Sequence, residues 1–379
     1  MKVALVHYWL VGMRGGEKVL EVLCELFPQA DIFTLVADPS ALSDTIRSHK
    51  IHTSFLQRVG GKKHYQKMLP LMPFALEAFD LTSYDLVISS EAGPAKGIIT
   101  RPDALHICYC HSPMRYIWDL YPQYSKSSGA LTRTMMSVVA PLLRQWDVAT
   151  SHRVDHFIAN SGYVAKRIEK FYRLGSTVIH PPVDISRFSI SKEVDDVYIC
   201  AGQITPYKKI EVAVEAFNRM GKRLDVIGSG ASEKLKAMAG PTIKFLGSLT
   251  DIEMALKFSR SKALIFPGVE DFGIVPLEIM ASGRPVIAFG RGGALETVVN
   301  GHTGLLFDDQ TAESLIDAVT QYEQGAVDGN PEDCRRHAET FSRDRFSAKL
   351  SSFIDERLAR HNHRAPVKAD GPQLIGLSR

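Results

Sequence analysis

The sequence has no long apolar run, and this argues against a protein that crosses a membrane. No stretch of about 18 apolar residues, the length that a membrane-spanning helix needs, occurs among the 379 residues. The first twelve residues superficially resemble a signal peptide, but they have no small-residue cleavage site, and His7 interrupts the apolar stretch. We therefore expect a cytoplasmic protein whose first residues form a strand.

Cysteine is scarce and odd in number. The five cysteines are scattered along the chain, mostly in apolar patterns, which favours buried free thiols in a reducing compartment. Cys108, Cys110 and His111 lie close together, but no second cysteine or histidine pair follows at zinc spacing. No Asp-x-Asp pair occurs either. We predict neither a metal site nor a bound cofactor.

Charge of one sign is not in large excess. The 45 lysines and arginines against 42 acidic residues give a net charge of +3, which is too small to predict a nucleic-acid partner. One local exception is the basic stretch 58–67, which apolar side chains follow as far as residue 76. Because cations beside exposed apolar residues suit an anionic bilayer surface, residues 58–76 predict membrane contact. The alternative is a solvated loop that leads into a core helix.

Strand and helix patterns alternate along the chain and predict two doubly wound α/β domains. Two prolines near residue 181 mark the seam, so we expect domains at 1–187 and 188–342 and a disordered tail at 361–379. The expected strands are 3–8, 31–36, 84–90, 104–110, 154–159, 197–201, 224–227, 242–246, 262–266, 285–289 and 303–307. The expected helices include 17–27, 209–220, 232–238, 252–259, 275–282, 312–324 and 345–360.

Two loops that follow strands of the first half carry candidate functional residues, and ligands bind at such loops in open α/β sheets. Gly15 and Gly16 follow the first strand, in a loop where backbone N–H groups can approach a phosphate or a sugar. A tight structural turn explains them equally well. His111 follows another strand and could donate to a sugar hydroxyl or relay a proton. A lone histidine there can also be a capping or packing residue.

Two loops of the second half carry charged residues at helix starts. Lys208 and Lys209 open a helix, where they oppose the helix dipole unless an anion such as a diphosphate lies there. Glu270 follows a buried strand, and Glu278 lies on the next helix. Carboxylates accept hydrogen bonds from sugar hydroxyls, and the N–H groups of a helix start bind oxygens. The alternatives are exposed lysines and an ordinary strand–loop–helix joint.

Taken together, these motifs resemble the glycosyltransferase family 4 pattern over nearly the whole chain. Glu270 and Glu278 have the Glu-x7-Glu spacing of that retaining family, with Phe272-Gly273 between them. The runs Gly-x-Ile-x-Pro-x-Lys at 202–208 and Ala-Ser-Gly-x-Pro at 281–285 match as well. The resemblance implies the GT-B fold, in which two Rossmann-like domains face a central cleft and the last helix, here 343–360, crosses back to the first domain. Residues 111–119 and 206–209 look most like bacterial mannosyltransferases of surface-polysaccharide (O-antigen or exopolysaccharide) assembly.

The resemblance also implies roles for single residues. Glu278 would hold the nucleotide ribose, Glu270 would bind the donor sugar, and His111 would face that sugar from the first domain. The lysines would neutralise the diphosphate, although Gln203 replaces an arginine that the family often has there. The expected catalytic residues are Glu270 and His111. The expected substrate-binding residues are Lys208, Lys209, Glu278, Asp271, Phe272, Gly273, Ile274, Val275, Gly15, Gly16, Ser161 and Gln203.

The reaction that the resemblance implies moves a sugar from a nucleoside diphosphate to an acceptor hydroxyl with retention. Mannose from GDP-mannose and a lipid-linked glycan acceptor are the expected substrates, and a UDP-sugar is the alternative donor. Whether Glu270 acts as a nucleophile, or the leaving phosphate guides the acceptor, stays open. A sugar-nucleotide-binding protein without catalysis is a rival. A nicotinamide-dependent oxidoreductase would need a Gly-x-Gly-x-x-Gly turn, which the sequence lacks.

Overall fold

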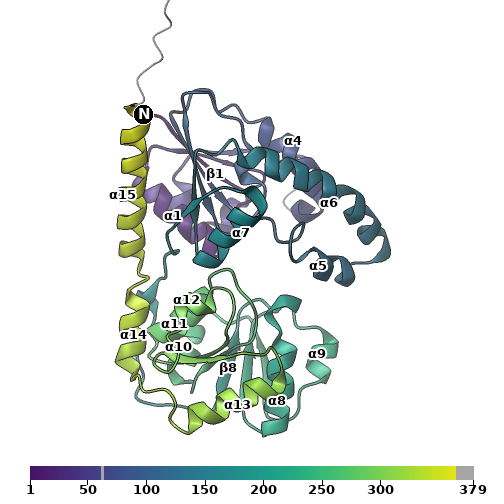
Figure 1. Cartoon of the computed structure of the whole chain (residues 1–379), viewed down its shortest axis with the longest axis vertical. Helices are drawn as coiled ribbons and strands as arrows, with labels where there is room; N and C mark the ends of the chain where they lie inside the picture. Colours follow the sequence, from purple (N-terminus) through teal and green to yellow (C-terminus); the bar gives the residue numbers. More distant parts are fainter. Residues whose placement is uncertain (61–63, 364–379) are drawn as a thin grey trace, which may run out of the picture.

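The computed structural model describes residues 1–60 and 64–363 and shows two α/β domains, one above the other (Figure 1). The first contains a seven-stranded sheet of order β3-β2-β1-β4-β5-β6-β7, in which every pair of neighbouring strands is parallel. Its strands are β1 (Val3–His7), β2 (Asp31–Thr34), β3 (Ile51–Thr53), β4 (Leu86–Glu91), β5 (Leu105–Cys110), β6 (His156–Ala159) and β7 (Ser176–Val178).

The second domain repeats the same topology on a six-stranded parallel sheet. Its order is β10-β9-β8-β11-β12-β13, so the strand order reverses between β8 and β11, as it does between β1 and β4 in the first sheet. Ligands bind at this point in doubly wound folds. The strands are β8 (Tyr198–Ala201), β9 (Leu224–Ile227), β10 (Ile243–Gly247), β11 (Leu264–Phe266), β12 (Val286–Phe289) and β13 (Gly304–Phe307).

Helices connect the strands in both domains. Those of the first domain and the linker are α1 (Gly15–Leu26), η1 (Pro39–Ala41), α2 (Asp44–Arg47), η2 (Phe55–Gln57), η3 (Tyr65–Leu71), α4 (Met72–Glu77), η4 (Ala95–Gly97), α5 (Tyr121–Ser127), α6 (Ala130–Ser151), α7 (Gly162–Tyr172) and η5 (Ile185–Arg187). The second domain has η6 (Pro206–Lys208), α8 (Ile210–Met220), α9 (Glu233–Ala237), α10 (Asp251–Arg260), α11 (Ile274–Ala281), α12 (Ala294–Thr297), α13 (Ala312–Glu323) and α14 (Pro331–Glu339), and α15 (Arg343–Asn362) ends the described chain.

The central strands are rich in apolar residues and are buried on both faces. Every residue of β1, β4, β5 and β8 is buried, as expected for a parallel sheet that helices cover on both sides. The edge strands β3 and β7 are three residues long and partly exposed. Their apolar signal is correspondingly weak, and the sequence reading missed both.

The glycine loop after β1 is shorter than predicted. Gly15 and Gly16, expected in a loop before a helix at 17–27, are the first two residues of α1. Glu17 explains the early start, because its carboxylate accepts the backbone N–H of Arg14 at 3.0 Å and so satisfies a free donor of the helix start. The two glycines therefore present their backbone within the first turn of a helix.

The last helix returns to the first domain, as predicted. Figure 1 shows α14 beside the second domain and α15 continuing along the first. Phe346, Leu350 and Ile354 are buried in the same apolar cluster as the inner face of α1. Arg343 adds ion pairs to Glu21 at 3.2 Å and Glu25 at 2.6 Å. The tail predicted to be disordered lies outside the described residues from position 364 onward.

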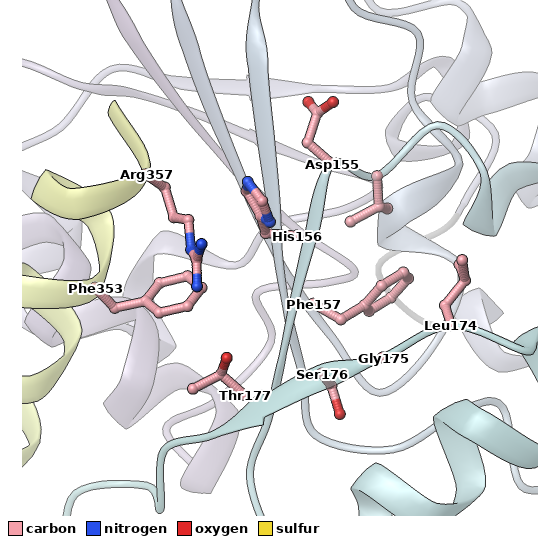
Figure 2. Close-up of a pocket in the computed structure, with 10 residues that line it drawn as sticks. Asp155, His156, Phe157, Leu174, Gly175, Ser176, Thr177, Phe353 and Arg357 are labelled. Atoms are coloured by element: carbon pink, nitrogen blue, oxygen red, sulfur yellow. The ribbon is translucent and has the colours of Figure 1, made fainter. Parts of the chain in front are cut away.

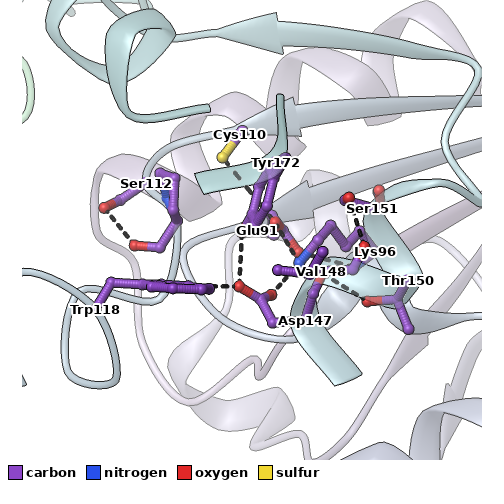
Figure 3. A network of polar contacts seen from close by, with 12 residues as sticks. Glu91, Lys96, Cys110, Ser112, Trp118, Asp147, Val148, Thr150, Ser151 and Tyr172 are labelled. Carbon is purple, nitrogen blue, oxygen red and sulfur yellow. Dashed lines mark hydrogen bonds and ion pairs between the residues drawn. The ribbon is translucent and has the colours of Figure 1, made fainter. Parts of the chain in front are cut away.

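A buried ionic network lies behind β4 and β5 (Figure 3). Lys96 is fully buried and pairs with Asp147 and, at 3.5 Å, with Glu91. Asp147 also accepts from Trp118 Nε1 at 2.7 Å and from the Tyr172 hydroxyl at 2.9 Å. Burial raises the pKa of Glu91 to about 7, against the attraction of Lys96. The network ties η4, α6 and α7 to Glu91 at the end of β4, and removing one partner of such a pair costs about 3–5 kcal/mol.

Candidate active site

Lys208 and Glu270 form an ion pair at the carboxyl ends of the second sheet. Lys208 Nζ lies 3.0 Å from Glu270 Oε1, and the two side chains are 13% and 16% exposed. Lys208 ends η6, after β8, and Glu270 follows β11. Because β8 and β11 are the two strands where the sheet order reverses, the pair lies where such folds bind ligands.

Glycines make room for the Lys208 side chain. A methyl group placed on Gly202 would lie 2.6 Å from Lys208 Nζ, and one on Gly268 would lie 2.6 Å from Lys208 Cα. Neither position tolerates a side chain without movement of Lys208. The next residue, Lys209, has a left-handed backbone with φ of 54° and pairs with Glu211 at 3.3 Å. The two adjacent lysines therefore differ in environment, and only Lys208 meets Glu270.

The start of α11 offers backbone donors without partners. Gly273 has φ of 88°, a left-handed conformation that favours glycine, and it precedes the first helical residue Ile274. The N–H groups of residues 272–275 donate to no acceptor within the described part of the chain. Free N–H groups and the helix dipole make such a start a ready site for phosphate or hydroxyl oxygens.

The first domain brings glycines and a histidine against this helix start. A methyl group on Gly15 would lie 2.8 Å from Ile274 Cδ1 of the second domain. One on Gly16 would lie 2.8 Å from the Tyr8 hydroxyl and 3.6 Å from His111 Nε2. The structure therefore places Gly15 against Ile274 and Gly16 beside His111, and the substrate-binding roles of these residues stay a prediction.

His111 belongs to a buried chain of polar groups that the sequence reading missed. Ser90 Oγ lies 2.9 Å from His111 Nε2 and 3.3 Å from His7 Nδ1, and His7 Nε2 lies 3.8 Å from Glu17 Oε1. Burial and the nearby His7 lower the pKa of His111 to about 3. The ring is therefore neutral at neutral pH and suited to hydrogen bonding rather than to donating a proton as imidazolium. The sequences of β1 and β4 give no sign that these side chains meet.

Glu278 lies on α11, where Arg187 of the linker faces it. Arg187 Nη2 is 3.5 Å from Glu278 Oε1 and also pairs with Asp251 at 2.8 Å. Burial raises the pKa of Glu278, while Arg187 opposes the shift. Gln203 is exposed beside Gly202. Both positions lie in the second domain, as the resemblance implied, and the structure contains no ligand-bound geometry for either.

Asp271 and Ser161, expected to bind substrate, are occupied by contacts between the domains. The Asp271 carboxylate pairs with Arg115 at 2.6 Å and Arg167 at 2.8 Å, and its backbone carbonyl accepts from Ser161 Oγ at 2.5 Å. Ser161 is fully buried and also caps α7 by accepting from Val164. The two side chains therefore join the domains, and Asp271 also lines a cavity between them.

Glu296 makes a second contact between the domains. Its carboxylate accepts the backbone N–H groups of Gly162 at 2.8 Å and Tyr163 at 3.1 Å, at the start of α7. His180 Nε2 lies 3.0 Å from the same carboxylate. A helix start capped by a carboxylate is a favourable pairing, and here the carboxylate comes from the other domain. No sequence motif indicated Glu296, because its partners are backbone groups more than a hundred residues away.

One cavity lies near this region, and a larger one lies far from it. One of about 160 Å³ lies between the domains, lined by Arg115, Tyr207 and Lys209 among others. A larger one of about 300 Å³ lies between β6, β7 and α15 (Figure 2). Its residues His156 and Ser176 begin their strands, so it opens at the amino ends of the sheet. We therefore assign the candidate active site to the cleft between the domains.

Comparison with known families agrees with this geometry. Residues 13–187 match the model described as Glycosyltransferase Family 4, and residues 183–341 match the one described as Glycosyl transferases group 1. Sucrose-phosphate synthase from Thermosynechococcus elongatus has a similar structure, with a TM-score of 0.68 at 15% identity over 95% of this chain and 100% of that one. Anabaena HepE in complex with UDP and glucose gives 0.67 at 15% identity over 94% and 100%. The fold is GT-B, and each half of the chain matches a glycosyltransferase model.

The matches to curated relatives cover a shorter part of this chain than the structural matches do. The GDP-mannose-dependent α-(1-6)-phosphatidylinositol monomannoside mannosyltransferase of Mycobacterium tuberculosis is 30% identical over 142 residues, which cover 32% of this chain and 37% of the relative. The D-inositol 3-phosphate glycosyltransferase of Corynebacterium glutamicum is 33% identical over 129 residues, 32% of this chain and 29% of the relative. The chain thus spans about a third of the length of these relatives.

Proposed function

We propose that the protein is a retaining glycosyltransferase that moves a sugar from a nucleoside diphosphate to an acceptor hydroxyl. The observation that carries the proposal is the Lys208–Glu270 pair beside the free N–H groups of the α11 start. Gly15, Gly16 and His111 lie across the cleft from this start. The cation and the free N–H groups suit phosphate oxygens, and the carboxylate suits sugar hydroxyls. A cleft that contains all three therefore fits a phosphorylated sugar.

The difficulty of this reaction is charge separation. As the bond between the anomeric carbon and the phosphate oxygen breaks, the sugar becomes oxocarbenium-like and the leaving diphosphate gains negative charge. Lys208 and the α11 N–H groups stabilise that charge, a contribution of several kcal/mol in a closed site. The acceptor oxygen then bonds to the anomeric carbon from the same face, and its proton passes to the leaving phosphate.

Glu270 binds the donor sugar in this proposal and is not the nucleophile. Its carboxylate is already paired with Lys208 at 3.0 Å, and such pairing reduces its nucleophilicity. His111 is neutral because burial lowers its pKa to about 3, so it hydrogen-bonds a sugar hydroxyl. Glu278 takes the ribose hydroxyls. It lies on α11, eight residues after Glu270, which leaves room for the diphosphate between the two carboxylates.

GDP-mannose is the proposed donor, and a lipid-linked glycan of surface-polysaccharide assembly is the proposed acceptor. The mannosyltransferase of Mycobacterium tuberculosis supports the donor, since its name specifies GDP-mannose and its match includes 32% of this chain. The alternative donor is a UDP-sugar, which HepE binds on a similar fold. None of the described helices is long and apolar enough to cross a membrane. We place the protein on the cytoplasmic face of the membrane, peripherally bound.

A donor panel tests the proposal. The melting temperature is measured with GDP, GDP-mannose, UDP and UDP-sugars, because ligand that binds the native state stabilises it. A rise with guanosine compounds alone is the expected result, and a rise with uridine compounds alone would reject GDP-mannose. Glu278→Ala should abolish the shift. Transfer of labelled sugar to a lipid acceptor separates an enzyme from a sugar-nucleotide-binding protein, which would give the shift without turnover.

A further inference from the structure

Helix α6 carries an apolar stripe that no described part of the chain covers. The stripe positions are separated by four, three and four residues, so they lie on one face of the helix. They are Leu131 (86% exposed), Met135 (46%), Val138 (63%) and Leu142 (61%). Another face of the same helix packs inward through Ala140, Leu143 and Asp147, which are buried. Exposed apolar surface in such an arrangement marks an interaction site.

A second exposed apolar surface adjoins α6. Leu71, at the end of η3, is 45% exposed, and Phe74 on α4 is 68% exposed. Leu69 of η3 packs on the same small cluster as Trp146 of α6, and Trp146 Nε1 donates to Glu77 of α4 at 3.1 Å. The stripe and the η3–α4 surface therefore belong to one lobe of the first domain, which we call the docking lobe.

The two acidic residues on the helices of the docking lobe are both engaged: Glu77 pairs with Arg153, and the buried Asp147 pairs with Lys96. Segments 45–76 and 120–146 contain nine lysines and arginines and no Asp or Glu. At the average of the whole chain, 42 acidic residues in 379, these segments together would contain about six. Arg58, Lys67 and Lys126 are exposed, and no carboxylate of the described residues pairs with them. Lys62 and Lys63, which the sequence reading placed in the same surface, lie outside the described residues.

We propose that the docking lobe binds the surface of an anionic lipid bilayer, with the α6 stripe inserted among the acyl chains. Apolar side chains enter such an interface while lysines and arginines meet anionic headgroups, and any acid there would be repelled. Both features are present, and they come from segments far apart in the sequence. In Figure 1, α6 and α5 extend outward from the body of the first domain, so the lobe can reach a flat surface.

The position of the lobe relative to the cleft adds to the proposal. Helix α5 directly precedes α6, and Leu120 and Gln123 beside it line the cavity between the domains. A bilayer bound to the lobe would therefore lie near one opening of the cleft. This would suit an acceptor anchored in lipid, as proposed above, but binding to the bilayer does not depend on the donor or the acceptor.

Vesicle sedimentation tests the lobe with a matched pair of variants. The full chain is mixed with phosphatidylcholine vesicles, with or without phosphatidylglycerol. Leu131→Glu with Val138→Glu places two acids on the stripe. The control, Ile252→Glu with Leu256→Glu, places two acids at exposed apolar positions of α10 in the second domain, where the residues are 84% and 58% exposed. Circular dichroism and the melting temperature verify that both variants fold.

The wild type and the control should bind the anionic vesicles, and the stripe variant should bind more than about tenfold more weakly, since two apolar side chains lose their burial. Equal binding of the stripe variant and the control would overturn the proposal. Failure of the wild type to bind anionic vesicles would overturn it as well. If the wild type dimerises without binding vesicles and the stripe variant is monomeric, the stripe binds a second copy of the chain instead. The donor-induced melting shift, measured in the same samples, reports the proposed activity separately.

Discussion

The carboxylate of Asp271 in the second domain lies 2.8 Å from Arg167 Nη1 in the first. Arg167 is 7% exposed and is itself held by Asp119 at 2.6 Å and by Ser112 Oγ at 2.6 Å. Asp271 directly follows Glu270, the residue that pairs with Lys208. The approach of the two domains is thereby linked to the geometry of the loop that would hold the donor sugar.

Removing this link should lower turnover more than donor affinity. Asp271→Asn keeps the size of the side chain but removes the charge that Arg115 and Arg167 share, which leaves the buried Arg167 with Asp119 alone and Arg115 without this carboxylate. We expect kcat to fall by about tenfold or more, with a smaller change in the donor Kd. The exposed neighbour Lys166→Ala on α7 is the control. An unchanged kcat in Asp271→Asn would show that the contact has no part in the reaction.

Gly16 and Gly12 provide a test of the first-domain side of the cleft. A methyl group on Gly16 meets the Tyr8 hydroxyl at 2.8 Å, whereas one on Gly12 meets nothing within 4 Å. Gly16→Ala should therefore displace the neighbouring side chains and reduce turnover by at least about tenfold, because small displacements at a reacting centre lower the rate strongly. Gly12→Ala should leave turnover unchanged. Steady-state kinetics with a saturating donor measures the difference. Equal activity of the two variants would contradict the assigned geometry.

The two adjacent lysines should differ in importance. Lys208 meets Glu270, and Lys209 pairs with Glu211. Loss of one charge-assisted contact to a diphosphate costs about 1.5–3 kcal/mol, so Lys208→Ala should weaken donor binding by roughly ten- to hundredfold. Lys209→Ala should change it only a few-fold. Titration calorimetry with the nucleoside diphosphate measures both, and a larger loss in Lys209→Ala would reverse the assignment.

Stability should fall on acidification because two buried histidines resist protonation. Burial lowers the pKa of His106 to about 4, and burial with the nearby His7 lowers that of His111 to about 3, while an unfolded histidine titrates near 6.5. Below about pH 6.5 the unfolded chain therefore binds protons that the native state does not. Each group then costs up to about 1.4 kcal/mol per pH unit until its folded pKa is reached. Above pH 6.5 neither contributes.

Denaturant unfolding at several pH values between 7 and 4.5 measures this loss. His106→Gln should remove one group and flatten the slope of the unfolding free energy against pH, whatever its effect at pH 7. His106 lies between Ser89 Oγ at 2.9 Å and the Arg153 carbonyl at 3.0 Å, which a glutamine amide can also contact. An unchanged slope in the variant would assign the acid sensitivity to other groups.

The sequence predicted the fold through its central strands and its glycines. β1, β4, β5 and β8 are mostly apolar and buried throughout, and their alternation with helix patterns is a local property. The edge strands β3 and β7 were not predicted, because three partly exposed residues give no recognisable hydrophobic pattern. The early start of α1 was not predicted either, because two adjacent glycines suggest a loop unless the capping contact of Glu17 is known.

The candidate site divides in the same way. Lys208, Glu270, Gly15, Gly16 and His111 follow strand ends and were predicted from that position. The contacts that Asp271 and Ser161 make between the domains were not, because their partners are distant in the sequence; substrate binding by these two residues stays a prediction. Arg167, His7 and Ser90 carry no motif, and the contacts His7–Ser90 and Arg167–Asp271 join residues 83 and 104 positions apart.

The sequence by itself determined the class of fold, the family pattern and the residues at the strand ends, since burial periodicity and loop position are encoded locally. Only the tertiary structure decided which charges meet. It assigned Lys208 to Glu270 and Asp271 to Arg167, and it gathered two acid-free segments into one exposed lobe. Charge pairing and surface exposure depend on the approach of distant segments, which periodicity along the chain does not specify.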